Sequence, residues 1–262
     1  AQLAKFAWGR SELLSFRSTD RVPLQAALYK PANFDPKKKY PVIDYVYGGP
    51  GVQLINDVWL GAAPLWMYWA AQEGYVIFTL ENRGSANRGR AFEQQTFRQL
   101  GPVEIEDQLT GVEWLKSQSF VDGDRMGLHG WSYGGFMSSN CILKGNDVFK
   151  AAIAVAPVTS WRYYDSIYTE RYMQTPQENA SGYDENSPIN HVSKLKGNYL
   201  LIHGTSDDNV HVQNTMVMIE ALVQANKQFD WAIYPDKNHG IYGGKTRLQL
   251  YTKMTNFIKE KL

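Results

Sequence analysis

Residues 130–135 constrain the fold of this chain more than any other part of the sequence. They read Gly-Trp-Ser-Tyr-Gly-Gly, which contains the G-x-S-x-G pattern of a serine on a sharp strand-to-helix turn. Residues 125–129 have the length of a buried strand, and apolar positions from Phe136 to Leu143 suit a short helix. Glycines beside a serine in a strained turn let backbone and substrate approach closely. The segment therefore predicts a nucleophile at Ser132.

Apolar runs alternate with helix-period segments along the rest of the chain. We expect a leading hairpin from residues 13–19 and 24–30, and then strands at 41–47, 76–80, 151–155, 199–203 and 229–234. Helices are expected at 66–72, 105–115, 216–223 and 248–262, with apolar stripes such as Met216, Ile219 and Val223. With the serine turn, this order predicts an α/β-hydrolase fold with a mostly parallel central sheet and helices on both faces.

Composition limits the classes of function. The 262 residues are 44% hydrophobic and 20% charged, which indicates one globular domain, 1–262, with a substantial core. A net charge of +1 gives no electrostatic reason for binding nucleic acid or an anionic membrane. Cys141 is the only cysteine, so the chain can form neither an internal disulfide nor a thiolate metal site. No apolar run reaches the roughly 18 residues of a membrane span.

A serine hydroxyl needs a base to take its proton, so the prediction requires a histidine and a carboxylate later in the chain. The expected strand 199–203 leads into a loop with Asp207 and Asp208, and His239 follows the strand 229–234. Ligands of such sheets gather beyond the carboxyl ends of the strands, where these side chains can meet Ser132. His239 is the expected base, and either aspartate could orient it.

The other histidines fit the role of base less well. His129 and His203 fall inside expected strands, where a hydrogen-bonded core histidine is the more common role. His191 comes too early in chain order, and His211 begins a helix beside the aspartate loop.

Acyl transfer also needs donors for the oxyanion. One is normally the N–H of the residue after the nucleophile, here Tyr133, and the second should come from residues 47–51, Tyr-Gly-Gly-Pro-Gly. That loop lacks the glycine patterns of phosphate and dinucleotide sites. The sequence therefore predicts neither a cofactor nor a metal.

Five segments together resemble the hydrolase domain of the dipeptidyl peptidase IV branch of the prolyl oligopeptidase family: residues 45–50, 130–135, 155–173, 203–211 and 238–241. The resemblance spans nearly the whole chain. It implies a serine exopeptidase that removes Xaa-Pro or Xaa-Ala dipeptides from peptide N-termini through an acyl-enzyme. The chain has Glu-Asn-Arg-Gly at 81–84 where the family usually has Asp-Gly-Arg-Gly, and it lacks the disulfide cysteines. These differences imply a bacterial-type relative, with a periplasmic or cell-envelope location.

The resemblance also implies a role for each matching residue. Ser132 would be the nucleophile, Asp207 rather than Asp208 the orienting carboxylate, and His239 the base. The Tyr47 hydroxyl would join the Tyr133 N–H in the oxyanion hole. Asn209 would hold the penultimate carbonyl, and the proline ring would sit in a substrate pocket of Trp131, Tyr133, Val158, Trp161, Tyr164, Tyr168 and Val210. Spacing alone would assign Trp161, Tyr164 and Tyr168 to the core.

Relatives of this kind carry a β-propeller before the hydrolase domain. This chain starts at Ala1, without Met or the layout of a signal peptide, so we expect it to be the C-terminal part of a longer protein. Such enzymes dimerise through their last helices, so a homodimer is possible in which Leu250, Met254 and Phe257 face the partner. Alternatives are a tripeptidyl or acylaminoacyl peptidase, a carboxylesterase with the same triad, or a non-enzymatic interaction domain.

Overall fold

The computed structural model describes residues 8–58, 64–145 and 147–262, and in these ranges eight strands form one sheet. The order across the sheet is β1-β2-β4-β3-β5-β6-β7-β8. Strands β1, β2 and β4 pair antiparallel, and every other neighbouring pair is parallel. The strands are β1 Arg10–Arg17, β2 Pro23–Lys30, β3 Tyr40–Val46, β4 Val76–Glu81, β5 Val121–Trp131, β6 Ala151–Val155, β7 Asn198–Gly204 and β8 Asp230–Tyr234.

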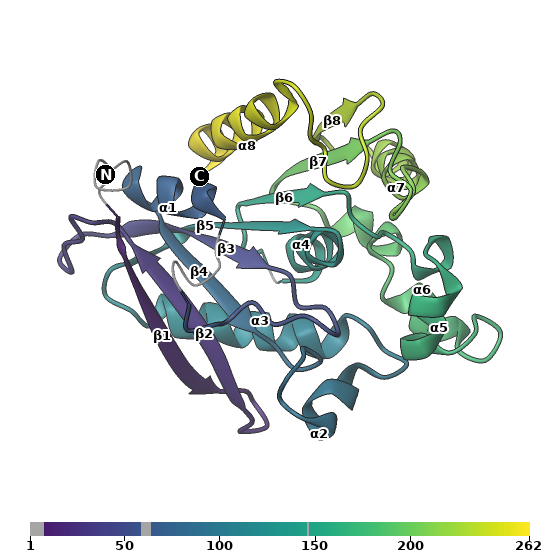
Figure 1. The fold of residues 1–262 in the computed structure, drawn as a ribbon, viewed down its shortest axis with the longest axis horizontal. Helices are drawn as coiled ribbons and strands as arrows, with labels where there is room; N and C mark the ends of the chain where they lie inside the picture. The colour runs from purple at the N-terminus through teal and green to yellow at the C-terminus, as the bar shows by residue number, and fades with distance from the viewer. Residues whose placement is uncertain (1–7, 59–63, 146) are drawn as a thin grey trace.

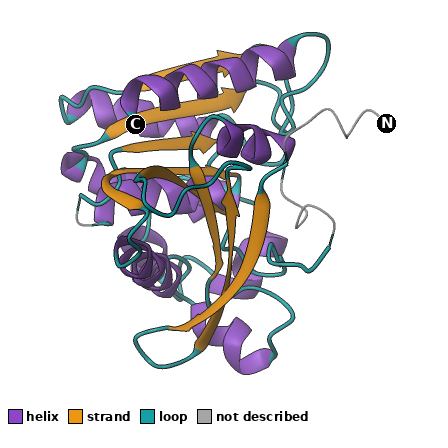
Figure 2. Ribbon diagram, turned by 90° about the vertical axis from the view of Figure 1, so that its left-hand side faces the viewer, coloured by secondary structure: helices purple, strands orange, loops and turns teal. Residues whose placement is uncertain are grey.

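Helices cover both faces of this twisted sheet (Figure 2). The α-helices are α1 Leu65–Gln72, α2 Arg90–Glu93, α3 Pro102–Lys116, α4 Tyr133–Lys144, α5 Ser166–Met173, α6 Ala180–Glu185, α7 Gln213–Gln224 and α8 Thr246–Lys261. Short 3₁₀ turns are η3 Gln94–Thr96, η4 Trp161–Tyr163 and η5 Pro188–Lys194. Helices α8 and α3 lie on opposite sides of the sheet in Figure 1.

Two apolar clusters, one on each side, hold the layers together. On one side α3, α4 and α7 pack on the sheet, and on the other side α1 and α8 do. All residues of β6 are buried, as expected for a central parallel strand that is covered on both faces. The architecture confirms the predicted α/β-hydrolase fold.

The structure confirms only part of what we expected of the last two long helices: of the predicted stripe on α7, Ile219 packs against the core. On α7 the buried apolar residues are Met218 and Leu222, whereas Met216 and Val223 are exposed. On α8, Leu250, Met254 and Phe257 lie in the core, so in this chain they do not face a partner. Leu248, the first residue of the helix expected over residues 248–262, is 70% exposed. On each of these helices the apolar residues form two neighbouring stripes. Packing against the sheet determines which stripe is buried.

Because these strands are parallel, the loops after β3, β5, β6, β7 and β8 all lie at the carboxyl-terminal ends of the strands, on one side of the molecule. This arrangement joins the segments that carry the predicted site. Our expectation of a longer protein was based partly on the first residues of the chain. Residues 1–7 lie outside the described residues. Among the described helices, none has the length and apolar character needed to cross a bilayer.

Candidate active site

Ser132 lies on the turn between β5 and α4, as the motif predicted. Its backbone has a positive φ of 61°, as expected for a strained turn, and a ψ of −119°, which differs from that of the left-handed helical region. The Ser132 N–H donates to Val155 O at 2.8 Å, and Ser132 O accepts from Phe136 N at 3.0 Å. These bonds fix a strained serine between strand and helix, which is the setting of an activated nucleophile.

The glycines around Ser132 are explained by close backbone contacts. A Cβ atom on Gly130 would lie 2.0 Å from Gly134 O, and one on Gly134 would lie 2.2 Å from Val46 O. A Cβ on Gly135 would lie 2.9 Å from Pro157 Cα. A side chain at Gly130 would therefore distort the turn itself, and one at Gly134 or Gly135 would push the turn away from β3 or from the loop after β6.

Asp207 and His239 meet beyond the ends of β7 and β8. The His239 Nδ1–H donates to Asp207 Oδ2 at 2.7 Å, which leaves Nε2 available as a proton acceptor. Asp207 Oδ1 accepts from the backbone N–H groups of Asn209 at 3.0 Å and Val210 at 2.9 Å. Burial would raise the pKa of Asp207, but hydrogen bonds to His203 and His239 outweigh it and hold that pKa well below its usual range. The carboxylate is thus ionised and fixed in place.

His203 is a further partner of Asp207 that the sequence did not reveal. Its Nε2 lies 3.2 Å from Asp207 Oδ2 and 2.8 Å from Val210 O, two acceptors that require a proton on Nε2. Its Nδ1 then accepts from the Thr215 hydroxyl at 2.7 Å. The sequence predicted a core histidine at position 203. Its contact with Asp207 was indicated by nothing more than its position four residues before that aspartate.

The remaining candidates lie apart from this pair. Asp208 is exposed and lines a separate hollow with His211, so the geometry distinguishes the two aspartates. His129 is buried within β5, as predicted, and burial lowers its pKa to about 4. His191 bonds to Glu185 O.

Trp131 connects the histidine loop to the serine turn. Its indole Nε1–H donates to His239 O at 2.9 Å. The guanidinium of Arg247 lies 5.2 Å from the centre of the Trp131 ring. Trp131 therefore fixes the loop beside Ser132 rather than lining the cavity described next.

A small cavity of about 30 Å³ opens at Ser132, and its walls are mostly aromatic. The Trp161 ring lies 5.3 Å from that of Tyr133 and stacks on Tyr168 at 6.0 Å. Tyr164 meets Tyr168 edge-on at 5.3 Å. Trp161 is nearly fully buried, yet it still contributes to the cavity wall, so core packing and pocket formation coincide here. The lining residues are Tyr47, Ser132, Tyr133, Val158, Trp161, Tyr164 and Tyr168.

Asn209 and Val210 lie beside this cavity but do not line it. The Tyr164 hydroxyl donates to Asn209 Oδ1 at 2.6 Å, and Val210 is fully buried next to Asp207. The structure thus brings together the predicted residues of the loops after β3, β5, β6 and β7, with Asn209 reaching the cavity through Tyr164.

Two groups at the cavity can donate to an oxyanion. Tyr133 is the first residue of α4, so its N–H has no acceptor within the helix. Tyr47 lines the same cavity, and burial, followed by the proximity of Tyr172, raises the pKa of its hydroxyl. The hydroxyl therefore keeps its proton at neutral pH and can act as a donor.

Two polar contacts behind these donors were also missed from the sequence. The Tyr133 hydroxyl donates to Glu104 Oε1 at 2.6 Å, and burial raises the pKa of Glu104 to about 7. Asn82 Nδ2 donates to Gly48 O at 2.9 Å, in the loop that carries Tyr47. The apolar spacing of α3 contains no information on a buried carboxyl group such as that of Glu104, and the sequence of residues 81–84 does not reveal the partner of Asn82.

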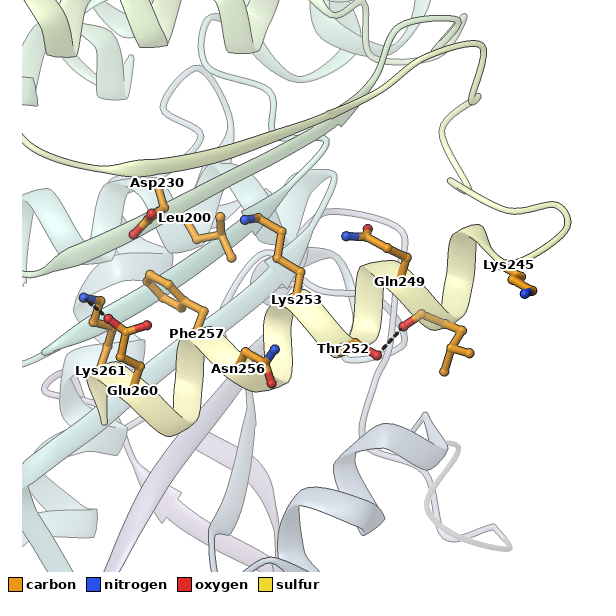
Figure 3. A pocket seen from close by; sticks show the side chains of 11 residues that line it. Leu200, Asp230, Lys245, Gln249, Thr252, Lys253, Asn256, Phe257, Glu260 and Lys261 are labelled. Carbon is orange, nitrogen blue, oxygen red and sulfur yellow. Dashed lines mark hydrogen bonds and ion pairs between the residues drawn. The ribbon is translucent and has the colours of Figure 1, made fainter.

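A larger hollow of about 640 Å³ lies away from the serine, between α8 and the strands β7 and β8. Figure 3 shows Phe257 and Lys253 of α8 beside Leu200 and Asp230 of these strands. The charged and amide side chains along it include none of the predicted site residues. Among the described residues, no group of three His, Cys, Asp or Glu side chains is arranged to hold a metal ion.

Comparison with known proteins adds independent observations. A model of the prolyl oligopeptidase family matches residues 64–262. Dipeptidyl peptidase 8 of Mus musculus is 40% identical over 255 residues, which cover 96% of this chain and 29% of the mouse protein. Prolyl endopeptidase FAP of Mus musculus is 44% identical over 234 residues, or 88% of this chain and 30% of that protein.

The same similarity is present among solved structures. The crystal structure of Porphyromonas gingivalis dipeptidyl peptidase 4 superposes with a TM-score of 0.95 at 44% sequence identity. The match covers 100% of this chain and 37% of that one. The chain therefore spans about three tenths of the length of the curated relatives it matches.

Proposed function

This chain belongs to the prolyl oligopeptidase family, and we propose that it is the catalytic hydrolase domain of a serine dipeptidyl peptidase. In this proposal the domain occupies residues 1–262 and works within a longer protein that also carries the family's β-propeller. The names of its relatives support a peptidase that acts at proline, since they include dipeptidyl peptidases and a prolyl endopeptidase.

The proposed reaction starts at the Ser132 hydroxyl. His239 Nε2 takes the hydroxyl proton while Oγ attacks the scissile carbonyl, and Asp207 holds the imidazole in the required tautomer. The resulting oxyanion accepts hydrogen bonds from the Tyr133 N–H and the Tyr47 hydroxyl. Collapse expels the leaving amine, which takes the proton from His239, and water then releases the dipeptide from Ser132 by the same steps. The chemistry needs no cofactor.

The aromatic cavity at the serine is the observation that carries the proposal. Ser132 shares one cavity with the rings of Trp161, Tyr164 and Tyr168. Flat apolar walls accept a pyrrolidine ring by contact and stacking without demanding a hydrogen bond. We propose that Val158 completes this proline site, that Val210 and Trp131 support it from outside the cavity, and that Asn209 binds the preceding carbonyl.

The test measures the activity of the full-length protein on four substrates. A dipeptidyl peptidase should release the amine from a Gly-Pro amide and lose that activity when the Gly amino group is acetylated. Equal or faster cleavage of the acetylated amide would indicate an endopeptidase or acylaminoacyl peptidase, and cleavage of a short-chain ester alone would indicate a carboxylesterase. A free tripeptide amide tests the tripeptidyl alternative, and Ser132→Ala controls for contaminating activity.

We further propose a homodimer, through residues other than those first considered. Among the described strands, β8 pairs only with β7 and so forms an edge of the sheet. Its Trp231 is 53% exposed, and Leu248 at the start of α8 is 70% exposed. Exposed edges with large apolar side chains favour pairing with another chain. Sedimentation of the full-length protein with and without Trp231→Glu tests this: the proposal predicts that the dimer dissociates in the variant.

A further inference from the structure

Helix α3 carries a buried polar face that the proposed mechanism does not use. Glu104, Asp107 and Gln108 are all fully buried, and their spacing of three and four places them on one side of the helix. Burial of polar groups is costly unless they are hydrogen-bonded. The partners of these side chains therefore indicate why α3 contains them, and two of the three lead to the oxyanion donors.

Glu104 forms a hydrogen bond with Tyr133, the residue whose N–H is the first donor. Its Oε1 accepts from the Tyr133 hydroxyl at 2.6 Å, and its Oε2 accepts from the Gly101 N–H at 2.9 Å. The carboxyl group is thus fixed to the start of α3 and holds the far end of the Tyr133 ring. The same ring lies against the loop of the second donor, because a Cβ on Gly49 would lie only 2.7 Å from Tyr133 Cγ.

Gln108 is connected to the second donor through one intermediate residue. Its Nε2 donates to Asn82 Oδ1 at 2.8 Å, and Asn82 Nδ2 donates to Gly48 O at 2.9 Å. Gly48 directly follows Tyr47 and has φ 76°. Asn82 and Gln108 are both fully buried, so water does not compete for these bonds.

We propose that Glu104 and Gln108 are positioning residues for the oxyanion hole, Glu104 through Tyr133 and Gln108 through Asn82 and the Tyr47 loop. This inference rests on the proposed function for the identity of the two donors. Neither residue touches the substrate. By fixing both donors to one helix, the pair sets the distance between the Tyr133 N–H and the Tyr47 hydroxyl before substrate binds, which is the preorganisation that oxyanion stabilisation requires.

The first test measures kcat and KM of the full-length protein on a Gly-Pro amide. Glu104→Ala should lower kcat by roughly 10–100-fold with little change in KM, because a donor displaced by a fraction of an ångström loses its transition-state contact. Glu104→Gln should restore most of the activity, because its amide can donate to the Tyr133 oxygen and accept from Gly101. If Glu104→Ala does not fold, Tyr133→Phe removes the same hydrogen bond and should lower kcat similarly.

A double-mutant cycle separates the two routes. Gln108→Ala should lower kcat about 10-fold in the wild-type background but hardly at all in a Tyr47→Phe background, where the donor that it positions is already absent. Glu104→Ala should lower kcat in both backgrounds, because the Tyr133 N–H that it positions is present in both. Val112→Ala, a buried apolar change on the same helix, is the matched control and should lower the melting temperature without lowering kcat.

The inference is overturned if Glu104→Gln lowers kcat as much as Glu104→Ala does. It is overturned as well if Gln108→Ala lowers kcat by the same factor with and without the Tyr47 hydroxyl. It is also overturned if Val112→Ala lowers kcat as much as the polar changes do. The rate of Ser132 labelling by a fluorophosphonate, whose oxygen occupies the same hole, repeats the comparison without a peptide. A wild-type protein that is labelled but cleaves no dipeptide amide would contradict the proposed function, while the labelling rates of the variants would still decide this inference.

Discussion

His239 Nδ1 lies 2.7 Å from Asp207 Oδ2, and His203 Nε2 lies 3.2 Å from the same oxygen. One carboxylate oxygen thus accepts from two imidazoles, while the other oxygen accepts from two backbone N–H groups. The buried carboxylate cannot rotate without breaking several hydrogen bonds. This arrangement suits Asp207, rather than its neighbour, to the proposed role of orienting His239 for proton transfer.

The two neighbouring aspartates should therefore respond very differently to substitution. In the full-length protein, Asp207→Asn should lower kcat by about 10³–10⁴-fold, because an amide at this position favours the wrong tautomer of His239. Asp208→Asn, an exposed change one residue away, is the matched control and should cost less than about threefold. Steady-state kinetics on a Gly-Pro amide measure both, and equal losses would contradict the assignment of Asp207.

In the proposed mechanism, the Tyr47 hydroxyl distinguishes this site from that of a hydrolase that uses only backbone donors. Tyr47→Phe should lower kcat by roughly 10²–10³-fold while KM changes little, because in this proposal the hydroxyl contacts only the developing oxyanion. A rise in KM at constant kcat would instead assign Tyr47 to substrate binding. A kcat within a few-fold of the wild type would remove it from the mechanism and favour the esterase alternative.

Asp44, in the middle of β3, should make the stability of the domain depend on pH. It is fully buried, neither carboxylate oxygen has a hydrogen-bond partner among the described residues, and burial raises its pKa from 3.8 to about 8. The folded state keeps a proton that the unfolded chain releases above about pH 4. Its contribution to the unfolding free energy therefore falls as pH rises from about 4 to 8, by up to about 1.4 kcal/mol per pH unit.

Asp44→Asn removes this titration and keeps the shape of the side chain. Any cost of the buried amide is independent of pH, so the variant should gain stability relative to the wild type as pH rises from 5 to 8. Urea denaturation of both proteins at several pH values measures the difference. A difference that stays constant over this range would show that Asp44 does not take up a proton on folding.

The parts of the site that were predicted from sequence depend on short-range patterns. The glycines around Ser132 leave a local pattern because each one avoids a close backbone contact. His239 was identified by chain order, since parallel strands carry successive loops to one edge of the sheet. Between Asp207 and Asp208 the local pattern gave no choice, because the difference depends on which carboxylate turns inward.

The features that were missed depend on packing. The buried faces of α7 and α8 could not be derived from apolar spacing, because Leu250 and Leu248 both belong to plausible stripes and only one meets the sheet. Glu104 and Gln108 resemble surface residues of an amphipathic helix, and their partners are distant in sequence. A buried polar contact of this kind has no periodic signal in the chain.

Covalent labelling of Ser132 is the most direct measurement of the central claim. After treatment of the full-length protein with a fluorophosphonate, mass spectrometry should find the adduct on the peptide that contains Ser132. Ser132→Ala should abolish labelling and leave the melting temperature within a few degrees of the wild type, and His239→Ala should slow labelling strongly. An intact Ser132 in the treated wild-type protein, or labelling that persists in Ser132→Ala, would contradict the account.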